Sequence, residues 1–179
     1  MNVDHLQPFS TVSVKPQDYS RILGLDPGLN STGWGIVDKE GFRIRYIACG
    51  VIKTSVSQDL SVRLSKIFQE LTQIMDQFQP DTTVVEETFV NKNPASALKL
   101  GMARGVILMA PSYKGLPVFS YTANQVKKSI VGAGHADKEQ VAAMIRVLLP
   151  TAPIKLLPDA SDALAVALCH GHQIKIRIS

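Results

Sequence analysis

The sequence predicts an α/β protein in which a mixed five-stranded sheet is flanked by helices. Three apolar segments come first, with short links between them, which is typical of an antiparallel meander. Segments with helical periodicity then alternate with two further short apolar runs, and this alternation indicates parallel strands covered by helices. With 179 residues, 45% of them hydrophobic, the chain has the size and the apolar content of one domain with its own core.

Each predicted strand is a short apolar run bounded by turn signals. Asp26-Pro27-Gly28 follows the first run, and the loop that contains Gly28 and Asn30 has hairpin character. Lys39-Glu40-Gly41 is the turn expected after the second run. The predicted strands cover residues 21–25, 32–37, 43–53, 82–88 and 117–121.

The predicted helices carry apolar residues at spacings of three and four, and prolines mark several of their ends. Pro80 stops the first and longest helix, and Pro94 suits the first turn of the next one. Thr122 suits the N-cap of the third helix, and Pro150 ends the fourth. The predicted helices cover residues 60–78, 94–110, 123–130, 137–149 and 159–172.

A single domain is expected over residues 21–172, between a poorly ordered N-terminal extension, residues 1–20, and a tail, residues 173–179. The extension contains Asp4 and lacks the apolar centre of a secretory signal. The chain contains no run of eighteen or more apolar residues, so no membrane span is expected. The two cysteines have the spacing neither of a zinc site nor of a disulfide framework, so two reduced core thiols in a cytoplasmic protein are expected.

Charge is distributed unevenly along the chain, whose formal net charge is +4. Residues 1–89 hold 8 of the 19 basic and 11 of the 15 acidic residues, a net charge of −3. Residues 90–179 hold 11 basic and 4 acidic residues, a net charge of +7. A basic second half suits a polyanionic partner such as nucleic acid, although surface lysines often serve only solubility.

Four acidic residues are the strongest candidates for chemistry. Asp26 and Glu86 each end an apolar run, and Asp159 and Asp162 open an alanine-rich helix. A carboxylate at the end of a buried strand is costly unless its charge is compensated. Carboxylates from distant segments that converge in space are what a site for hard divalent cations needs.

The spacing alone leaves plainer interpretations open. Asp26 also fits a simple turn residue. Glu86 and Glu87 face opposite sides of a strand, so only one can share a face with Asp26, and the alternation does not choose between them. One acid in the first turn of the last helix is explained by the helix dipole, but two on one face repel each other. A cation between them would remove that repulsion.

Five segments together resemble the RuvC family of bacterial Holliday junction endodeoxyribonucleases. The match runs in order over about residues 21–172, and the combination of all five segments is highly specific. The segments are Ile22-Leu23-Gly24-Leu25-Asp26-Pro27-Gly28 with Thr32-Gly33-Trp34-Gly35, Val85-Glu86-Glu87-Thr88-Phe89 with Lys92-Asn93, Ser96-Ala97-Leu98-Lys99-Leu100-Gly101 with Ala103-Arg104-Gly105, Gln125-Val126-Lys127-Lys128 with Val131-Gly132, and Asp159-Ala160-Ser161-Asp162-Ala163-Leu164-Ala165.

The resemblance implies a ribonuclease H-like fold and a metal-dependent nuclease that resolves four-way junction DNA by symmetric nicks. It implies that Asp26, Glu86, Asp159 and Asp162 are the catalytic, metal-binding carboxylates, and it selects Glu86 over Glu87. Two Mg²⁺ ions about 4 Å apart are expected in each site, with Mn²⁺ as an alternative. It also implies a homodimer with two active sites, and work alongside the RuvA and RuvB branch-migration proteins.

The same resemblance implies contacts with DNA. Lys127 is expected to approach the scissile phosphate, and Lys138 is expected to contact the backbone near the site. Phe89 is expected to stack on opened bases, although its position also fits a core aromatic. Further candidates for phosphate contacts, each of which also fits a solvated surface residue, are Lys92, Lys99, Arg104, Lys114 and Lys128.

Gly101 and Gly105 lie four apart inside one predicted helix, where glycine costs about 1 kcal/mol each. Close approach to a second helix would explain both, either in a dimer interface with Leu98, Met102 and Met109 or against the chain's own sheet.

Two other functions are weighed against the junction nuclease. An ATPase of the actin-like fold would use glycines such as Gly28 and Gly33, but it needs a second domain of this kind. A junction-binding module without catalysis would not need four intact carboxylates.

Overall fold

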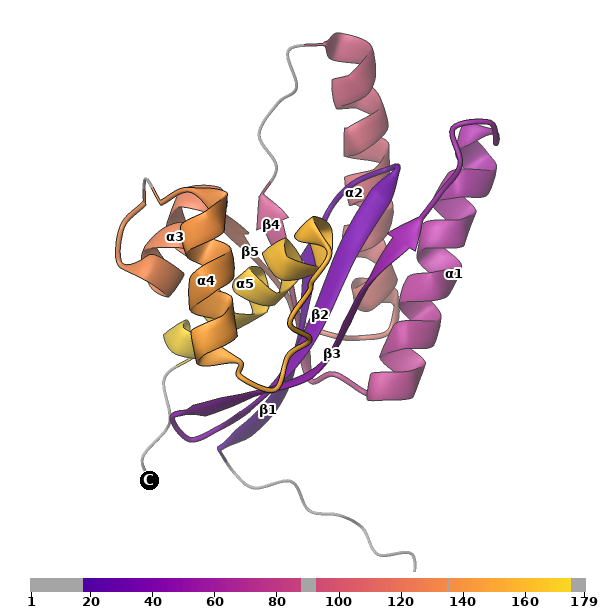
Figure 1. The fold of residues 1–179 in the computed structure, drawn as a ribbon. Coiled ribbons are helices and arrows are strands. Elements are labelled where there is room, and N and C mark those ends of the chain that lie inside the picture. Colours follow the sequence, from indigo (N-terminus) through magenta and orange to yellow (C-terminus); the bar gives the residue numbers. More distant parts are fainter. Residues whose placement is uncertain (1–17, 88–92, 135, 175–179) are drawn as a thin grey trace, which may run out of the picture.

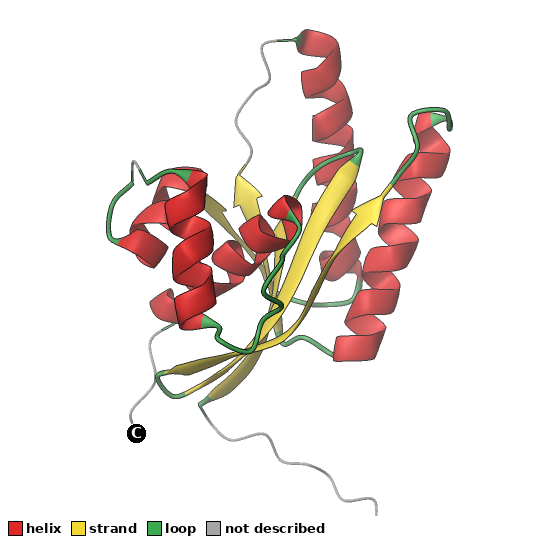
Figure 2. Cartoon of the chain, in the orientation of Figure 1, coloured by secondary structure: helices red, strands yellow, loops and turns green. Residues whose placement is uncertain are grey.

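The computed structural model describes residues 18–87, 93–134 and 136–174, and in it a central sheet lies between two groups of helices (Figure 1). Figure 2 shows the same arrangement by element type, with helices on either side of the strands. The elements are β1 (Tyr19–Asp26), β2 (Ser31–Glu40), β3 (Arg43–Lys53), α1 (Leu60–Phe78), β4 (Thr82–Glu87), α2 (Pro94–Tyr113), β5 (Val118–Thr122), α3 (Ala123–Val131), α4 (Lys138–Leu148) and α5 (Pro158–Gln173).

The sheet has the strand order β3-β2-β1-β4-β5. β1 pairs antiparallel with β2, and β2 pairs antiparallel with β3. β4 lies parallel to both β1 and β5. The predicted mixed five-stranded sheet flanked by helices is therefore confirmed.

Alternation along β1 separates two apolar cores. Ile22 belongs to the core that α3, α4 and α5 cover. Leu23, which points to the opposite side, belongs to the core that α1 and α2 cover. Because β1 is central and covered on both faces, its apolar run is nearly continuous rather than alternating with polar residues.

Most elements differ from the prediction by one to three residues at their ends, and two of these differences have a clear physical cause. The turn expected at residues 39–41 lies one step later, because β2 continues its pairing to Glu40 and Gly41 supplies a positive φ of 57°. The helix expected to end near residue 110 continues to Tyr113 and includes Pro111. Pro111 is tolerated because it lies in the last turn, where little helix remains to be disrupted.

α5 crosses β1 and β2 at very close range. Its residues from Ala160 to Gly171 are almost all buried, and alanine is frequent among them. A side chain at Gly24 would collide with the Ala163 carbonyl oxygen and would stand 2.8 Å from the Ala167 nitrogen. A side chain at Gly33 would collide with the Asp159 carbonyl oxygen. Glycine at these two positions lets the helix approach the strands, and this approach sets the position of its acidic first turn.

None of the helices in the described ranges is long and apolar enough to cross a membrane.

Candidate active site

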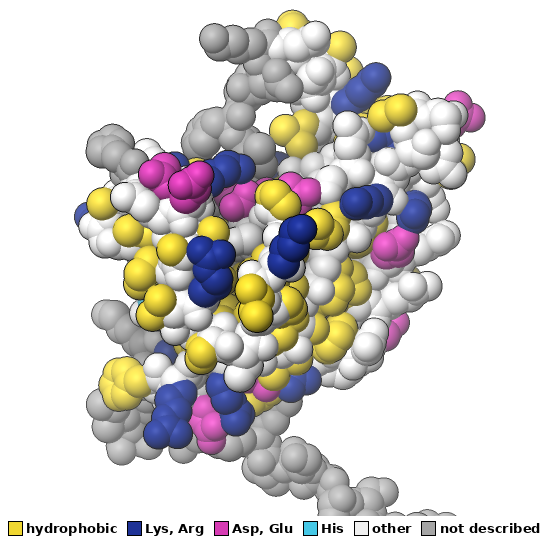
Figure 3. Space-filling view, in the orientation of Figure 1, with side chains coloured by type: hydrophobic (Ala, Val, Ile, Leu, Met, Phe, Trp, Pro, Cys, Tyr) yellow, Lys and Arg dark blue, Asp and Glu magenta, His cyan; other side chains and the backbone are white. Residues whose placement is uncertain are grey.

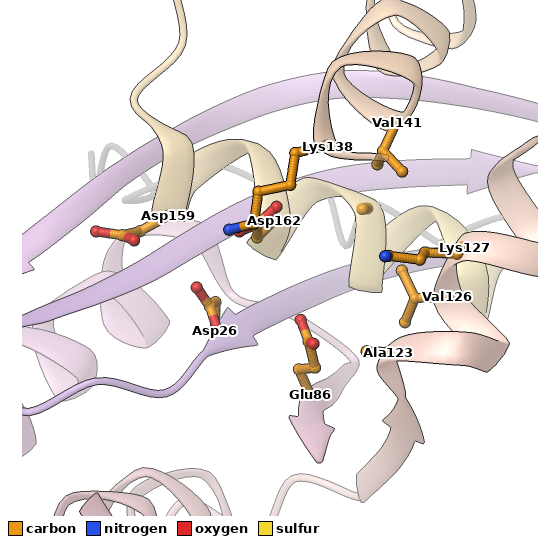
Figure 4. Close-up of a pocket in the computed structure, with 10 residues that line it drawn as sticks. Asp26, Glu86, Ala123, Val126, Lys127, Lys138, Val141, Asp159 and Asp162 are labelled. Atoms are coloured by element: carbon orange, nitrogen blue, oxygen red, sulfur yellow. The ribbon is translucent and has the colours of Figure 1, made fainter. Parts of the chain in front are cut away.

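The four candidate carboxylates line one cavity of about 300 Å³ (Figure 4). Lys127 and Lys138 line the same cavity. Small apolar side chains complete its wall, namely Ala123, Val126, Val141 and Ala165. Acidic residues from the first strand and from the last helix of the domain therefore meet in one place.

Parallel pairing brings the first two acids together. Leu25 of β1 lies beside Val85 of β4, so Asp26 and Glu86, the next residue in each strand, reach the same edge of the sheet. Glu86 faces the cavity, whereas Glu87, which alternates to the other side, does not line it. The register thus makes the choice between Glu86 and Glu87 that alternation alone left open.

Asp159 and Asp162 come from the first turns of α5 and face the same cavity. The Ser31 hydroxyl at the start of β2 donates a hydrogen bond to Oδ2 of Asp159. The Lys138 ammonium, at the start of α4, donates to Oδ2 of Asp162 at 3.3 Å. Sequence reasoning missed Ser31, and no local pattern could have found it, because only tertiary packing brings it to a residue 128 positions away.

The cavity concentrates more negative charge than its lysines neutralise. Burial, then the charges of Glu86, Asp162 and Asp159, raises the pKa of Asp26 from 3.8 to about 7, against the opposing effect of Lys138. Burial and Asp162 likewise raise the pKa of Glu86. The Asp162 carboxylate raises the pKa of Lys138, so that lysine stays charged. This imbalance is what bound cations would correct.

The donor set fits a hard divalent cation, because all four acidic side chains offer carboxylate oxygens. Across the ranges that the structure describes, no three acidic, histidine or cysteine side chains are grouped tightly enough to hold an ion by themselves. Mg²⁺ does not require such a cage, since it keeps several waters and takes one or two carboxylates together with substrate phosphate. The open ring of carboxylates therefore suits a cation that the substrate helps to bind.

Comparison with known proteins identifies the family. Residues 22–170 match the family model described as Crossover junction endodeoxyribonuclease RuvC. The chain belongs to the RuvC family. A curated relative of that name from Xanthobacter autotrophicus is 54% identical over 152 residues, which are 85% of this chain and 89% of the relative. A second relative of that name, from Paramagnetospirillum magneticum, is 53% identical over 152 residues, which are 85% of this chain and 91% of the relative.

Solved structures agree with this assignment to the RuvC family. T. thermophilus RuvC, in a structure described as a complex with Holliday junction substrate, is 34% identical, with a TM-score of 0.80 over 86% of this chain and 93% of that one. A yeast mitochondrial Holliday junction resolvase has a TM-score of 0.61 at 12% identity, which shows the likeness of the fold alone. The ribonuclease H-like fold expected from the sequence is confirmed as the fold of this RuvC chain.

The predicted DNA-contacting residues lie in different places on the RuvC chain. Lys127 and Lys138 line the same cavity as the four carboxylates, and Lys128 lies on α3 outside it. Lys99 lines a separate cavity, and Arg104 is half-buried on α2. In the space-filling view, basic and acidic side chains lie side by side near the starts of α4 and α5 (Figure 3).

Three predicted DNA contacts remain, at Lys114, Phe89 and Lys92, and the structure tests none of them. Lys114 forms an ion pair with Asp76, so its charge is already matched within the chain. Phe89 and Lys92 lie outside the described residues, and their expected roles stay predictions.

The residues predicted for the dimer interface lie on the exposed surface of α2. Leu98, Met102 and Met109 are 63%, 41% and 53% exposed. A side chain built at Gly101 or Gly105 would meet nothing within 4 Å among the described residues. Packing against the chain's own sheet therefore does not account for these two glycines.

We expect Lys138→Ala to lower the rate of junction cleavage by about 10- to 100-fold, since an ammonium beside the reacting phosphate stabilises developing negative charge. The variant should also require less metal, because loss of the Lys138 charge leaves the negative charge of Asp26 and Glu86 less neutralised. Single-turnover cleavage measured across a metal titration checks both effects. Lys66→Ala, on the outer surface of α1 beside Glu70, is the control, and equal losses in the two variants would contradict the assignment.

Proposed function

We propose that this chain is a metal-dependent, structure-selective endonuclease that resolves Holliday junctions by symmetric nicks through phosphodiester hydrolysis. The observation that carries the proposal is the cavity in which Asp26, Glu86, Asp159 and Asp162 face Lys127 and Lys138 in a member of the RuvC family. The T. thermophilus RuvC structure is described as a complex with Holliday junction substrate, and 34% identity at a TM-score of 0.80 supports the same substrate here.

The side chains divide the chemistry between them. The charges of all three other acids act on Asp26, so Asp26 would be the residue to share two ions, while each of the others would hold one ion or complete the cluster. Divalent cations, when bound, would activate a water molecule and neutralise the leaving oxygen. Lys127 and Lys138 would hold the scissile phosphate and offset its developing charge.

Mg²⁺ is the proposed ion, with two per site, and Mn²⁺ is the alternative because both accept oxygen ligands. Two observations support this choice. The donor set consists of carboxylates, and the raised pKa of Asp26 reflects a cavity whose negative charge favours added cations.

Further DNA contacts are proposed for Phe89, Lys92, Lys99, Arg104 and Lys128. Lys99 is exposed and basic, which suits contact with a phosphate backbone. Phe89 follows β4 by two residues in the sequence, and an aromatic side chain can stack on an unpaired base.

A homodimer through α2 is part of the proposal. Leu98, Met102 and Met109, together with Gly101 and Gly105, give one helix surface that is apolar, exposed and open to close approach by another helix. A two-fold dimer suits a substrate that has two equivalent strands to cut.

Met102→Glu should convert the dimer to a monomer without unfolding it, because it places a charge in an apolar interface but on an exposed position of the single chain. Sedimentation and thermal denaturation measure the two properties. Val62→Glu is the matched control, because Val62 is a comparably exposed apolar residue on α1. A dimeric Met102→Glu protein would exclude this interface.

Work with the RuvA and RuvB branch-migration proteins, and a cytoplasmic location with access to bacterial DNA, complete the proposal. Family membership supports both.

The decisive experiment incubates the protein with a synthetic four-way junction and Mg²⁺. Paired nicks at symmetry-related positions support the proposal, and the same bases in a linear duplex should stay intact. Junction binding without nicks would instead indicate a non-catalytic binding module, and ATP hydrolysis would indicate the actin-like alternative.

A further inference from the structure

A second cavity, of about 520 Å³, lies beside the catalytic one. It is bordered by the loop between β1 and β2 and by the N-terminal parts of α1 and α2. Ser31 lines this cavity, and its hydroxyl donates a hydrogen bond to Asp159, which lines the catalytic cavity, so one hydrogen bond links the two cavities. The lining residues are Gly28, Leu29, Asn30, Ser31, Val56, Arg63, Ser96, Lys99 and Leu100.

Arg63 is the unusual feature of this second cavity. Only 6% of the residue is exposed, and it lies in the first turn of α1. Its Nε donates to the Thr54 hydroxyl at 2.9 Å, and its Nη2 donates to the side-chain oxygen of Asn30. Both partners are neutral, and among the residues that the structure describes no carboxylate lies within ion-pair distance of this guanidinium. A buried charge without a counter-ion is costly.

The rest of the lining adds positive charge and no negative charge. Lys99 is exposed at the rim, and no acidic side chain contributes to the wall within the described part of the chain. Nη1 of Arg63 and the amide nitrogen of Asn30 donate to no partner within the same ranges. The cavity therefore offers cations and unused N–H donors, the combination that recognises a phosphate oxygen.

We propose that this cavity binds a non-scissile backbone phosphate of the same DNA strand that the catalytic cavity cuts. The inference rests on the proposed nuclease function and adds a subsite to it. The two cavities have opposite charge and are linked by the bond between Ser31 and Asp159. A DNA strand that crosses them places one phosphate at the acidic cavity, where cations must mediate the contact, and another at the basic cavity, where Arg63 and Lys99 contact it directly.

The test uses four-way junctions in which a single phosphate is replaced by an uncharged methylphosphonate, moved position by position along the cut strand. Binding is measured without divalent metal for the wild-type protein, Lys99→Ala and Lys66→Ala. At one non-scissile position the replacement should weaken binding by the wild-type protein and by Lys66→Ala about 5- to 10-fold, but should weaken binding by Lys99→Ala less than about 2-fold. Lys99→Ala should also lower the slope of log K against log salt by about 1.

Arg63→Lys supplies a second measurement, because it keeps the charge but loses the planar fork. With its thermal stability recorded alongside, it should show the same reduced response at the same position. If every replacement costs Lys99→Ala as much as it costs the wild-type protein, the proposed subsite is wrong. Because these arms measure binding without metal, that failure is separate from a failure of the wild-type protein to cut intact junctions, which would overturn the nuclease function instead.

Discussion

Asp26→Asn should abolish junction cleavage, with a loss of about 1,000-fold or more, and leave junction binding intact. Asp26 ends β1 in the cavity that the other three carboxylates also line, and an amide in its place would not supply the negative charge that a ligand shared by two cations would provide. Removing one negative charge from a site that receives phosphate should, if anything, tighten binding in the absence of metal. Single-turnover cleavage and a binding titration on the same junction measure the two properties.

The same substitution should stabilise the metal-free protein. The folded-state pKa of Asp26 is raised from 3.8 to about 7, chiefly by burial and then by the neighbouring acids. The stability associated with this group is therefore fully present below about pH 4 and is lost as the pH rises through about 7. At pH 8 an uncharged residue avoids that loss, which amounts to about 4 kcal/mol for a pKa raised from 3.8 to about 7, or about 10 °C in melting temperature.

Melting in EDTA between pH 5 and pH 8 checks this expectation. The advantage of Asp26→Asn over the wild-type protein should grow with pH, and added Mg²⁺ should reduce it by stabilising the wild-type protein. Asp76→Asn is the control. Asp76 is an exposed residue of α1 that pairs with Lys114, so its replacement should not raise the melting temperature. A variant that still nicks junctions, or that melts below the wild-type protein at pH 8, would contradict the role given to Asp26.

The positions of the strand-borne acids could be predicted because they follow from local patterns. An apolar run that ends in Asp26 and another that ends in Glu86 identify two buried strands, and parallel strands present their carboxyl ends at one edge of the sheet. The first turn of α5 could be predicted in the same way, from a helix that is apolar nearly all round. The family resemblance then supplied the choice of Glu86, which the register between β1 and β4 now explains.

The contacts between side chains could not be predicted in this way. Ser31 meets Asp159 across 128 positions, and Lys138 meets Asp162 across 24, only because α5 and α4 are placed by packing. Arg63 illustrates the same limit, since a charged residue in the first turn of a helix is normally expected to be exposed to solvent. Its burial against the loop after β1 depends on hydrogen-bond partners that come from two other segments.

Gly33 has no side chain that could take part in a reaction, but it determines the position of the acidic first turn of α5. It lies in β2 directly beneath the first turn of α5, where an added methyl group would collide with the Asp159 carbonyl oxygen and stand 3.1 Å from the Asp159 Cβ. Both of these atoms belong to Asp159, whose position the site depends on. The carbonyl oxygen is part of the backbone, so rotating a side chain cannot relieve the collision. Gly33→Ala must therefore move the start of α5 away from β2.

We expect Gly33→Ala to lower cleavage by about 100-fold, the scale of loss that a displacement of about 1 Å causes in a positioned catalytic group. Overpacking should also cost about 1–3 kcal/mol of the free energy of unfolding. Gly24→Ala separates the two effects, because Gly24 lies under Ala163 and Ala167, further along α5. It should lose comparable stability but less activity.

Urea denaturation and single-turnover cleavage, both well below the melting temperatures, measure these quantities for each variant. Gly134→Ala is the matched control, since its added methyl group would meet only the carbonyl oxygen of Asn124 among the described residues, at an ordinary 3.8 Å. A Gly33→Ala protein that cuts junctions at the wild-type rate would show that the acidic turn of α5 is not held in place by its contact with β2. If Gly33→Ala and Gly24→Ala instead lose activity equally, the loss reflects stability rather than the position of Asp159 and Asp162.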